Sequence, residues 1–545
     1  MIEVSNLRVP LKQLDGTEEG ELRTCRRAAA RKLGIREGRI RRIELRKRSI
    51  DARKRTAILL TYTLRLEVQG DEVELTRDRR HNARLVEELP YALPSLHATA
   101  RNGDERPVVV GAGCAGLFCA LALASAGLAP LLVEQGDDAE RRTEAVQHFN
   151  ATGELDPRSN IQFGLGGAGT FSDGKLGTGT SSPAHRLILQ TLVEAGAQRR
   201  ILWDAKPHVG SDVLPGVVTR IVQRIEGLGG EVRFRTQLTG LDCEHGRVTG
   251  VRLLREGREE RVATHNVVLA CGHSARDVFE LLDREGVALE RKTFAMGVRI
   301  EHLQSSVDRA LFGPSAGHPA LGAASYKLAE HLPGGRSAFS FCMCPGGYVV
   351  AAASEQGGVV TNGMSLSDRA GINANAGLLA NVFPEDLPGD DVLAGIELQR
   401  TCEQAAYERG GGGRGTGAFA APAQLVGDFL AQAPSSAAGS VKPTYPRGVT
   451  WGALEGTLPE YVLETLRGVI PRMEHKLRGF SAPDAVLTGV ETRSSSPVRV
   501  TRGKDGQSVS TPGLWPCGEG AGYAGGIMSA ATDGLRTAEA LIAHH

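Results

Sequence analysis

The chain has 545 residues, enough for about two to four domains, and 41% of them are hydrophobic, as in an ordinary globular protein. The formal net charge of +1 excludes a global attraction to nucleic acid or to membranes. No apolar run approaches the roughly 18 residues that cross a bilayer, and neither a signal peptide nor a cysteine pattern typical of metal sites or disulfides is visible. We therefore expect a cytoplasmic protein without a metal centre.

Residues 1–100 predict a small basic α+β domain. The pattern indicates a helix at Glu21–Leu33, with alanines at its centre, and a linker at Pro90–Arg106. Three strands rich in β-branched or aromatic residues are expected at Ile2–Val9, Arg41–Leu45 and Thr56–Val68.

This domain carries a dense run of positive charge. The segment Arg23–Arg55 contains 15 lysines or arginines and three acidic residues. Such a run could bind RNA or another polyanion. It could also be a solvated surface that keeps a helix and an edge strand soluble, which is the more common case. The run lacks the aromatic residues that stack on bases.

The segment from Val108 to Glu134 has every part of a dinucleotide-binding unit. The strand Val108–Val110 runs into the G-x-G-x-x-G sequence Gly111–Gly116, which a helix at Leu117–Ala126 and a strand at Leu131–Val133 follow. The glycines allow a tight turn and close approach to a pyrophosphate, and the helix N-terminus attracts phosphate. Glu134 is placed to accept hydrogen bonds from a ribose. The motif alone leaves FAD and NAD open.

Several strings resemble a bacterial family of uncharacterised FAD-dependent dehydrogenases, within the glutathione-reductase-like, two-dinucleotide-binding-fold flavoproteins. The strings are Asn160–Gly164, Gly166–Leu176, Phe341–Gly347, Thr361–Ser365 and Glu491–Pro497. The resemblance covers most of the chain and implies no particular substrate. It implies an α/β fold with a Rossmann-like FAD-binding domain (101–290 and 480–545), an inserted mixed α+β substrate domain (291–479) and an added N-terminal domain (1–100).

Three further segments resemble parts of such flavoproteins and favour FAD over NAD. In those proteins, a strand such as Glu231–Arg235 meets the adenine, here at Val232, after a helix like the one predicted at Val217–Leu228. Val267–Ala270 resembles an apolar strand that ends in Ala-Thr-Gly, with Cys271 in place of Thr. In the closing segment Gly513–Gly520, an acid, here Glu519, is implied to hold the ribityl chain, and the last helix would stabilise negative charge on the reduced flavin.

A second glycine-rich cradle is expected at Gly166–Lys175. Its backbone N–H groups could reach the pyrophosphate or the flavin, and Thr170, Ser172 and Lys175 could donate hydrogen bonds, although a flexible surface loop is the alternative. Leu165 stands where an acid is expected. The predicted cofactor-binding residues are Gly111, Gly113, Ala115, Gly116, Glu134, Gln135, Gly167, Gly169, Thr170, Phe171, Ser172, Lys175, Val232, Ala270, Cys271, Gly272, Gly518, Glu519, Gly526 and Ile527.

Candidates for catalysis are weaker. Cys342 and Cys344 lie two apart on a strand expected at Phe339–Met343, so both would point to one face and could form a redox pair, though two buried cysteines are the more common case. Arg493 and Arg499 could bind a carboxylate. Proton donors could come from Lys327, Tyr326, Glu491, His302 and Tyr445. The glycine-rich Gly410–Gly417 is interpreted as a mobile lid or a disordered loop.

The leading interpretation is an FAD-dependent dehydrogenase or reductase that passes a hydride between flavin N5 and a small organic substrate. No second complete dinucleotide motif is present, so NADH or NADPH would act only as a transient reductant. Two alternatives stay open. One is an RNA-modifying flavoprotein that grips RNA through its N-terminal domain, and the other is a flavin-fold binding protein without redox turnover.

Overall fold

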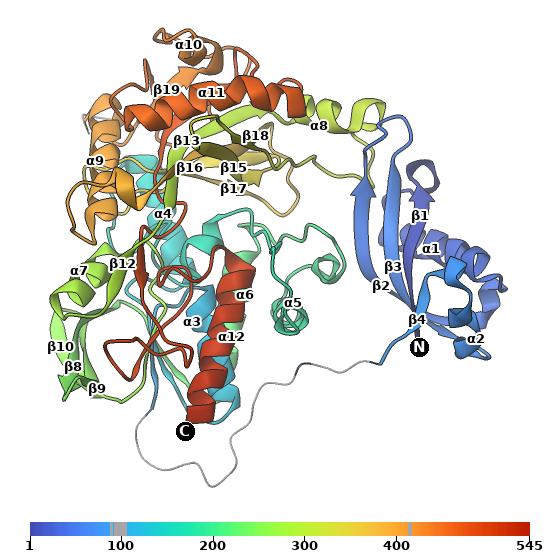
Figure 1. The fold of residues 1–545 in the computed structure, drawn as a ribbon, viewed down its shortest axis with the longest axis horizontal. Helices are drawn as coiled ribbons and strands as arrows, with labels where there is room; N and C mark the ends of the chain where they lie inside the picture. Colours follow the sequence, from blue (N-terminus) through green and yellow to red (C-terminus); the bar gives the residue numbers. More distant parts are fainter. Residues whose placement is uncertain (88–90, 92–105, 413–416, 545) are drawn as a thin grey trace.

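The computed structural model describes residues 1–87, 91, 106–412 and 417–544. Three regions make up the molecule: an N-terminal sheet, a parallel sheet packed against helices, and a larger sheet above it that we call the cap sheet (Figure 1). The fold is therefore mixed α/β, with the predicted Rossmann-like domain and a small N-terminal domain. The predicted linker lies outside the described residues, apart from Tyr91 and Arg106, and so does part of Gly410–Gly417.

The N-terminal region is a four-stranded antiparallel sheet in the order β2-β3-β1-β4. Alternate residues of β3, from Leu60 to Leu66, are fully buried, so one face of the sheet packs into a core that includes α1. Helix α1 begins where the Thr17 side chain accepts the Gly20 N–H and ends at Gly34 in the left-handed conformation. Its elements are β1 (Ile2–Pro10), α1 (Glu18–Leu33), β2 (Ile40–Asp51), β3 (Leu59–Val68), α2 (Glu72–Arg77) and β4 (Ala83–Leu85).

Part of the basic run serves this fold. The Arg26 guanidinium donates to the Ile40 carbonyl, and Arg53 pairs with Asp51. Arg48 is buried in an ion pair with Glu21. Others, such as Arg41 and Arg42, are exposed. Contact with RNA stays a prediction.

The central sheet is entirely parallel, in the order β23-β11-β5-β6-β7. Helices α3, α5, α6 and α12 pack into one core beside it, and α7 packs with the three-stranded sheet β8–β10 into another. Helix α12 passes close to α3, because Gly534 faces the Ala115 backbone with no room for a side chain. The elements are β5 (Val108–Val110), α3 (Cys114–Ser125), β6 (Leu131–Val133), α4 (Ala139–Thr152), α5 (Ala184–Glu194), α6 (Leu214–Gly227), β7 (Glu231–Arg233), β8 (Thr236–Glu244), β9 (Arg247–Arg255), β10 (Arg258–Ala263), β11 (Val267–Leu269), α7 (Arg276–Arg284), β23 (Leu514–Pro516) and α12 (Ile527–His544).

The cap sheet has seven strands in the order β14-β15-β18-β13-β21-β19-β20, with α8 and α11 packed against it. Strand β21, which the sequence placed in the closing part of the FAD-binding domain, pairs with β13 and β19 of this sheet. The elements are β12 (Leu289–Arg291), β13 (Phe294–Leu303), α8 (Gln304–Phe312), β14 (Ala329–His331), β15 (Ser337–Cys344), β16 (Gly347–Ala351), β17 (Thr361–Ser365), β18 (Asn373–Val382), α9 (Ala394–Arg409), β19 (Ala421–Leu425), α10 (Val426–Leu430), β20 (Val449–Trp451), α11 (Glu460–Lys476), β21 (Val486–Glu491) and β22 (Val498–Val500).

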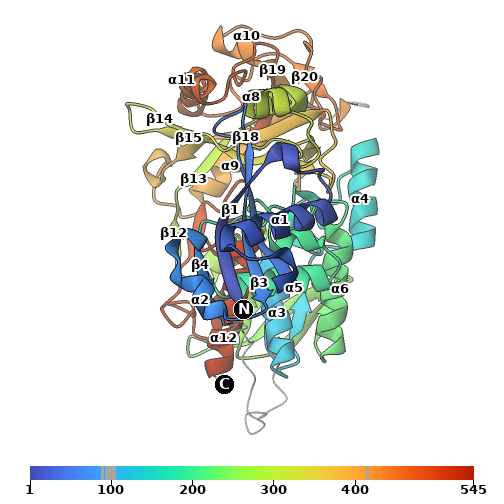
Figure 2. The ribbon, with the colours of Figure 1, turned by 90° about the vertical axis from the view of Figure 1, so that its right-hand side faces the viewer.

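The N-terminal sheet stands beside the other two regions (Figures 1 and 2). Its strand β2 contacts residues 203–205, which follow α5, and the cap segment that contains Ala320. The first domain is therefore in contact with both of the regions that form the cavity described below. Among the described residues, no helix is both long and apolar enough to span a bilayer.

Candidate functional site

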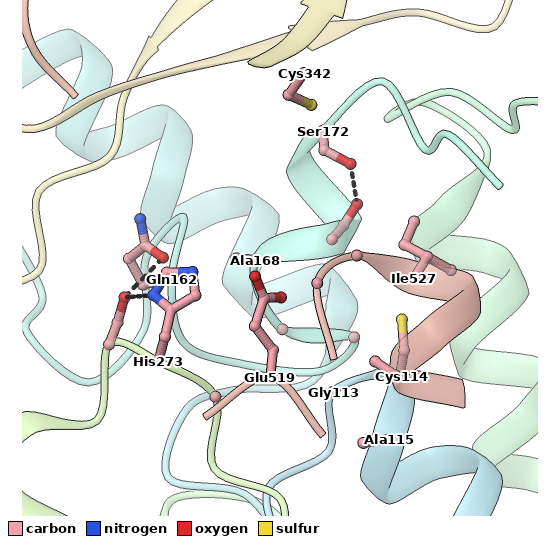
Figure 3. A pocket seen from close by; sticks show the side chains of 18 of the residues that line it. Gly113, Cys114, Ala115, Gln162, Ala168, Ser172, His273, Cys342, Glu519 and Ile527 are labelled. Carbon is pink, nitrogen blue, oxygen red and sulfur yellow. Dashed lines mark hydrogen bonds between the residues drawn. The ribbon is translucent and has the colours of Figure 1, made fainter. Parts of the chain in front are cut away.

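A cavity of about 640 Å³ lies between the parallel sheet and the cap sheet. Its size falls in the range of pockets that hold small molecules and cofactors. One wall carries the loops after β5 and β6 and the start of α12, and the opposite wall carries residues 339–343 of β15. Figure 3 shows Gly113 and Ala115 at one side, Glu519 in the middle, and Ser172 and Cys342 at the other side.

The first glycine loop leaves open space above the start of α3. Gly111 has φ +101°, and a side chain there would collide with the Ala270 carbonyl. A Cβ on Gly113 would instead face the cavity, with the Gly167 Cα 3.9 Å away. Gly113 is the N-cap of α3 and has no side-chain cap, so the first N–H groups of this helix are free for a ligand. Gly116 packs the helix against the loop and does not line the cavity.

Glu134 joins three loops at the end of β6. Its carboxylate accepts the N–H groups of Ala112 (2.9 Å), Gly136 (3.0 Å) and Gly164 (3.0 Å), and the side chain is buried beside the cavity. The predicted ribose acceptor therefore also holds the glycine loop in place. The predicted Gln135 lines the cavity next to it.

The second cradle lies directly beside the first. The Gly166 N–H donates to the Ala112 carbonyl (2.8 Å), and Gly167–Phe171 forms a short 3-10 helix. Of the residues predicted here to bind the cofactor, Gly167, Gly169, Ser172 and Lys175 line the cavity. Thr170 does not, because its hydroxyl donates to the Leu165 carbonyl, and Phe171 does not, because its ring packs under Arg142.

Arg142 is a residue that sequence reasoning missed. It is fully buried on α4, and its guanidinium donates to the carbonyls of Asn160 (2.9 Å), Ile161 (2.9 Å), Gly164 (3.2 Å) and Leu165 (2.7 Å). Burial lowers the pKa of Arg142 to about 10, so it stays charged at neutral pH. This one cation orders the turn that leads into the second cradle.

The closing segment brings an acid into the centre of the cavity. The Glu519 side chain points into it, close to the start of α12 (Figure 3). Burial raises the pKa of Glu519 to about 7, although the Gly526 N–H donates to the carboxylate. The predicted Ala270, Cys271, Gly272, Gly526 and Ile527 also line the cavity, whereas Gly518 is packed against Ala115.

His273 and Gln162 are further residues that the sequence did not reveal. The Ser274 hydroxyl lies 3.0 Å from Gln162 Oε1 and 3.1 Å from His273 Nδ1 (Figure 3). Burial, Arg493 and Arg276 lower the pKa of His273 to about 4, so its ring is neutral at pH 7. Gln162 lies within the string Asn160–Gly164, and His273 directly follows the predicted Gly272, so both were close to residues that the sequence singled out.

The predicted adenine contact at Val232 stays a prediction. Val232 lies in the middle of β7 and does not line the cavity, whereas Thr236, Gln237 and Leu238 do. Strand β7 ends at Arg233, and the chain then turns into β8 above the carboxyl ends of β6 and β7. The residues after the strand, rather than those within it, face the ligand space.

A bulge in β15 separates the two candidate cysteines. The pairing with β18 shifts between Phe341 and Cys344, and Cys342 has φ +40°. Cys342 therefore lines the cavity, whereas Cys344 is fully buried. The expectation that both point to one face is wrong, because it assumed a regular strand. Both thiols are free.

Two cations hold this bulge toward the cavity. Arg299 donates to the Cys342 carbonyl (3.0 Å), and the Lys175 ammonium donates to the Met343 carbonyl. A side-chain hydrogen bond with Cys344 and the positive charges of Lys175 and Arg299 hold the pKa of Cys342 below its usual value. Lys175 thus faces the cap bulge, where it also lies 3.2 Å from Asp173. Lys175, which was predicted to donate to phosphate or flavin, therefore makes its contacts with this bulge and with Asp173.

The two candidate arginines are already paired. Arg493 lines the cavity, but its guanidinium donates to both oxygens of Glu403, which also pairs with Arg276. These two arginines lower the pKa of Glu403 to about 2 against the effect of burial. Arg499 pairs with Glu290 and does not line the cavity. The Arg493 guanidinium is therefore engaged by Glu403, and Arg499 lies outside the cavity, so neither is placed for the carboxylate contact that the sequence suggested.

The remaining candidates divide into two groups. Tyr326 and Lys327 line the cavity. His302 lies 2.8 Å from the Phe480 carbonyl and Tyr445 donates to the Phe419 carbonyl, and neither lines the cavity. Glu491 is buried against Arg299. His302, Tyr445 and Glu491 therefore stabilise the cap.

Family models match three parts of the chain. A model described as an FAD binding domain matches residues 140–297, and one described as an FAD-dependent protein, C-terminal domain-like, matches residues 293–494. A domain of unknown function matches residues 1–67. FAD is the cofactor.

The sequence also has a close relative. An uncharacterized protein of Clostridium beijerinckii is 42% identical over 527 residues, which cover 96% of each chain. The chain belongs to the family of this clostridial protein. Its predicted place among glutathione-reductase-like flavoproteins stays a prediction.

Two solved structures are far more distant in sequence. A geranylgeranyl bacteriochlorophyll reductase-like protein from Thermoplasma acidophilum is 13% identical, with a TM-score of 0.35, and the match covers 81% of this chain and 79% of that one. A myxobacterial chondrochloren halogenase, a variant of the FAD-dependent halogenases, is 12% identical, with a TM-score of 0.36 and coverage of 80% and 72%.

The residues of the cavity fit FAD. Glycines stand where a cofactor would approach the backbone, and a Cβ on Gly272 or Gly526 would meet nothing within 4 Å. The uncapped start of α3 offers N–H groups for phosphate, and the cavity reaches from there to the start of α12.

Proposed function

We propose that this protein is an FAD-dependent oxidoreductase that passes a hydride between flavin N5 and a small organic substrate. The observation that carries the proposal is the continuity of the cavity. It is lined by both glycine loops on one side and by Phe339–Met343 of the cap on the other. A cofactor seated on the loops would therefore leave one face toward the cap, where a substrate can stack.

The proposed cofactor contacts follow the order of the loops. The N–H groups at Gly113 and the start of α3 would bind the pyrophosphate, and Glu134 would bind the adenosine ribose. Glu519 would hold the ribityl chain, and the N-terminus of α12 would stabilise negative charge on the flavin. When bound, FAD would supply a two-electron acceptor and donor.

The chain's own groups can handle the accompanying proton. Glu519, with a pKa of about 7, can both take up and release a proton at neutral pH. The neutral His273 can accept a hydrogen bond inside the cavity.

An absorbance spectrum of the purified protein, followed by anaerobic titration with NADH and NADPH, tests this proposal. We expect a flavin spectrum that bleaches on reduction, either by one of the nicotinamides or by light with a sacrificial donor. A colourless protein would contradict cofactor binding. A yellow protein that no donor can reduce would instead support a binding protein without turnover.

A further inference from the structure

The cap end of the cavity carries more positive than negative charge. Lys175, Lys206, Lys327 and Arg369 line it. Asp173 neutralises only part of this charge, because its carboxylate pairs with both Arg369 (2.9 Å) and Lys175 (3.2 Å). Within the described residues, Lys206 and Lys327 have no acidic partner, and both are exposed at the cavity mouth. We call Lys206, Lys327 and Arg369 the cationic mouth.

The positions of these cations are fixed by the fold. The Lys206 ammonium donates to the Ser325 hydroxyl (3.1 Å), which joins the segment after α5 to the cap segment that carries Lys327. Although Lys206 as a residue is exposed, its ammonium is partly desolvated at the cavity wall, and this desolvation together with the charges of Arg369 and Lys175 lowers the pKa of Lys206. A bound anion would offset the repulsion between these positive charges.

An apolar surface continues inward from the cationic mouth. Three aromatic residues line the cavity: Tyr326, which is next to Lys327 in the chain, and Phe339 and Phe341, which lie on the strand that carries Cys342. Phe339 and Phe341 are two apart on β15, upstream of the bulge, so their side chains share the face that borders the cavity. Aromatic residues make up only 5% of the chain, so three at one wall form a distinct surface.

The phosphates of FAD do not account for this charge. They are expected at Gly113 and the start of α3, and Figure 3 places Gly113 across the cavity from Cys342, with Glu519 between them. The charge excess at the mouth therefore belongs to the side that remains for substrate.

We propose that the substrate is an organic anion whose carboxylate or phosphate binds at the cationic mouth and whose apolar, unsaturated body lies along Tyr326, Phe339 and Phe341. This proposal rests on the proposed function, since it assigns the substrate class of the same site. Lysine ammonium groups bind such oxyanions as point charges, and the aromatic wall binds the carbon skeleton. The reacting carbon would lie beyond Phe341, nearest to Glu519.

Binding of matched probes to the FAD-loaded protein tests the proposal. Cinnamate, cinnamyl phosphate and uncharged cinnamamide share one carbon body and are titrated while the visible flavin absorbance is followed. We expect at least one of the two anions to bind roughly tenfold tighter than the amide, and its affinity to fall as salt is raised. The anion that binds more tightly shows whether the site prefers a carboxylate or a phosphate.

Two variants assign the effect to the mouth. Lys206→Met should lower the affinity for the anion by about tenfold and leave the affinity for the amide unchanged. Lys504→Met, at an exposed loop lysine away from the cavity, should change neither affinity. Equal binding of anions and amide, no binding of either anion, or equal effects of the two variants would overturn the proposal. NADPH binding that depends on Lys206, without binding of the cinnamates, would overturn it in favour of a dinucleotide phosphate.

The same experiments distinguish failure of the proposed substrate class from failure of the proposed FAD-dependent function. A protein that binds FAD and is reduced, but shows no preference for the anions, disproves the substrate class alone. A protein without flavin, or with flavin that cannot be reduced, disproves the proposed function.

Discussion

Arg48 of the N-terminal domain and Asp204 of the segment after α5 face each other at 3.7 Å across the junction of two domains. Their backbones also pair, since the Arg48 N–H donates to the Trp203 carbonyl (2.7 Å) and the Ala205 N–H donates to the Arg48 carbonyl (2.8 Å). The same guanidinium reaches Glu21 and the Ala320 carbonyl (2.5 Å). The N-terminal domain thus holds the segment that leads directly to Lys206.

Arg48→Met should weaken binding at the cationic mouth without loss of FAD. The substitution leaves Glu21 without its partner, and breaking a buried pair of this kind costs about 3 kcal/mol of stability. We expect a lower melting temperature and a weaker anion affinity, with flavin content per chain unchanged. Arg42→Met, at an exposed position of the same strand, is the control and should match the parent protein. Loss of flavin in parallel with anion affinity would show that Arg48 acts only on the overall fold.

Cys342 should react with iodoacetamide at neutral pH much faster than Cys243. Its pKa is held below the usual value, so the reactive thiolate persists at pH 7 and is lost only in acid. Cys243 is exposed, but burial of its sulfur and nearby acids raise its pKa, so it should react only in alkaline solution. Mass spectrometry of the alkylated peptides measures both rates in one sample.

Lys175→Gln is the matched variant for this experiment. Removal of the ammonium should shift the onset of Cys342 alkylation to higher pH and leave Cys243 unchanged. An unchanged pH profile for Cys342 would mean that Lys175 does not stabilise the thiolate.

Glu519→Gln should change how the stability of flavin-free protein depends on pH. The folded-state pKa of about 7 exceeds the ordinary 4.5, so folding favours the protonated acid. The contribution of protonated Glu519 to folding stability is fully present below pH 4.5 and is lost as the pH rises through about 7. The amide cannot ionise, so the variant should be more stable than the parent at pH 8, by about 3 kcal/mol at most, and equal to it at pH 4.

Thermal unfolding at these two pH values checks the prediction. Glu464→Gln removes an exposed carboxylate and should have little effect at either pH. If the stability difference between Glu519→Gln and the parent is the same at pH 4 and at pH 8, the buried acid titrates normally and the prediction is wrong.

Local patterns allowed the nucleotide-binding half of the site to be predicted. The order of strand, glycine turn, helix, strand and acid from Val108 to Glu134 depends on neighbours within the chain, and the structure contains each part. The closing segment with Glu519 was recognised in the same way. The helix begins at Cys114 rather than Leu117, because its first turn contains the last glycine of the motif.

Contacts between distant segments could not be predicted. Arg142 resembles any helical arginine until Asn160–Leu165 folds around it. The position of Cys342 depends on a bulge that shows only in the pairing of β15 with β18. Arg493 is a plausible carboxylate ligand in the sequence, and only the fold brings Glu403 to it. The errors therefore concern the cap, where long-range pairing decides which side chains face the cavity.

The central claim is that FAD lies over Gly113, with the cavity extending from there to the cap. Gly113 has φ −76°, which any residue adopts, and a Cβ there would point into open cavity. Gly113→Val should therefore fold normally and fill the space of the pyrophosphate. Gly38→Val, at a glycine whose Cβ would meet nothing within 4 Å, is the control.

Flavin content per chain, measured for these two variants beside the parent protein, tests the claim most directly. We expect one FAD per chain in the parent and in Gly38→Val, and a flavin-free but folded Gly113→Val protein. A Gly113→Val protein that retains a full complement of FAD would contradict the account.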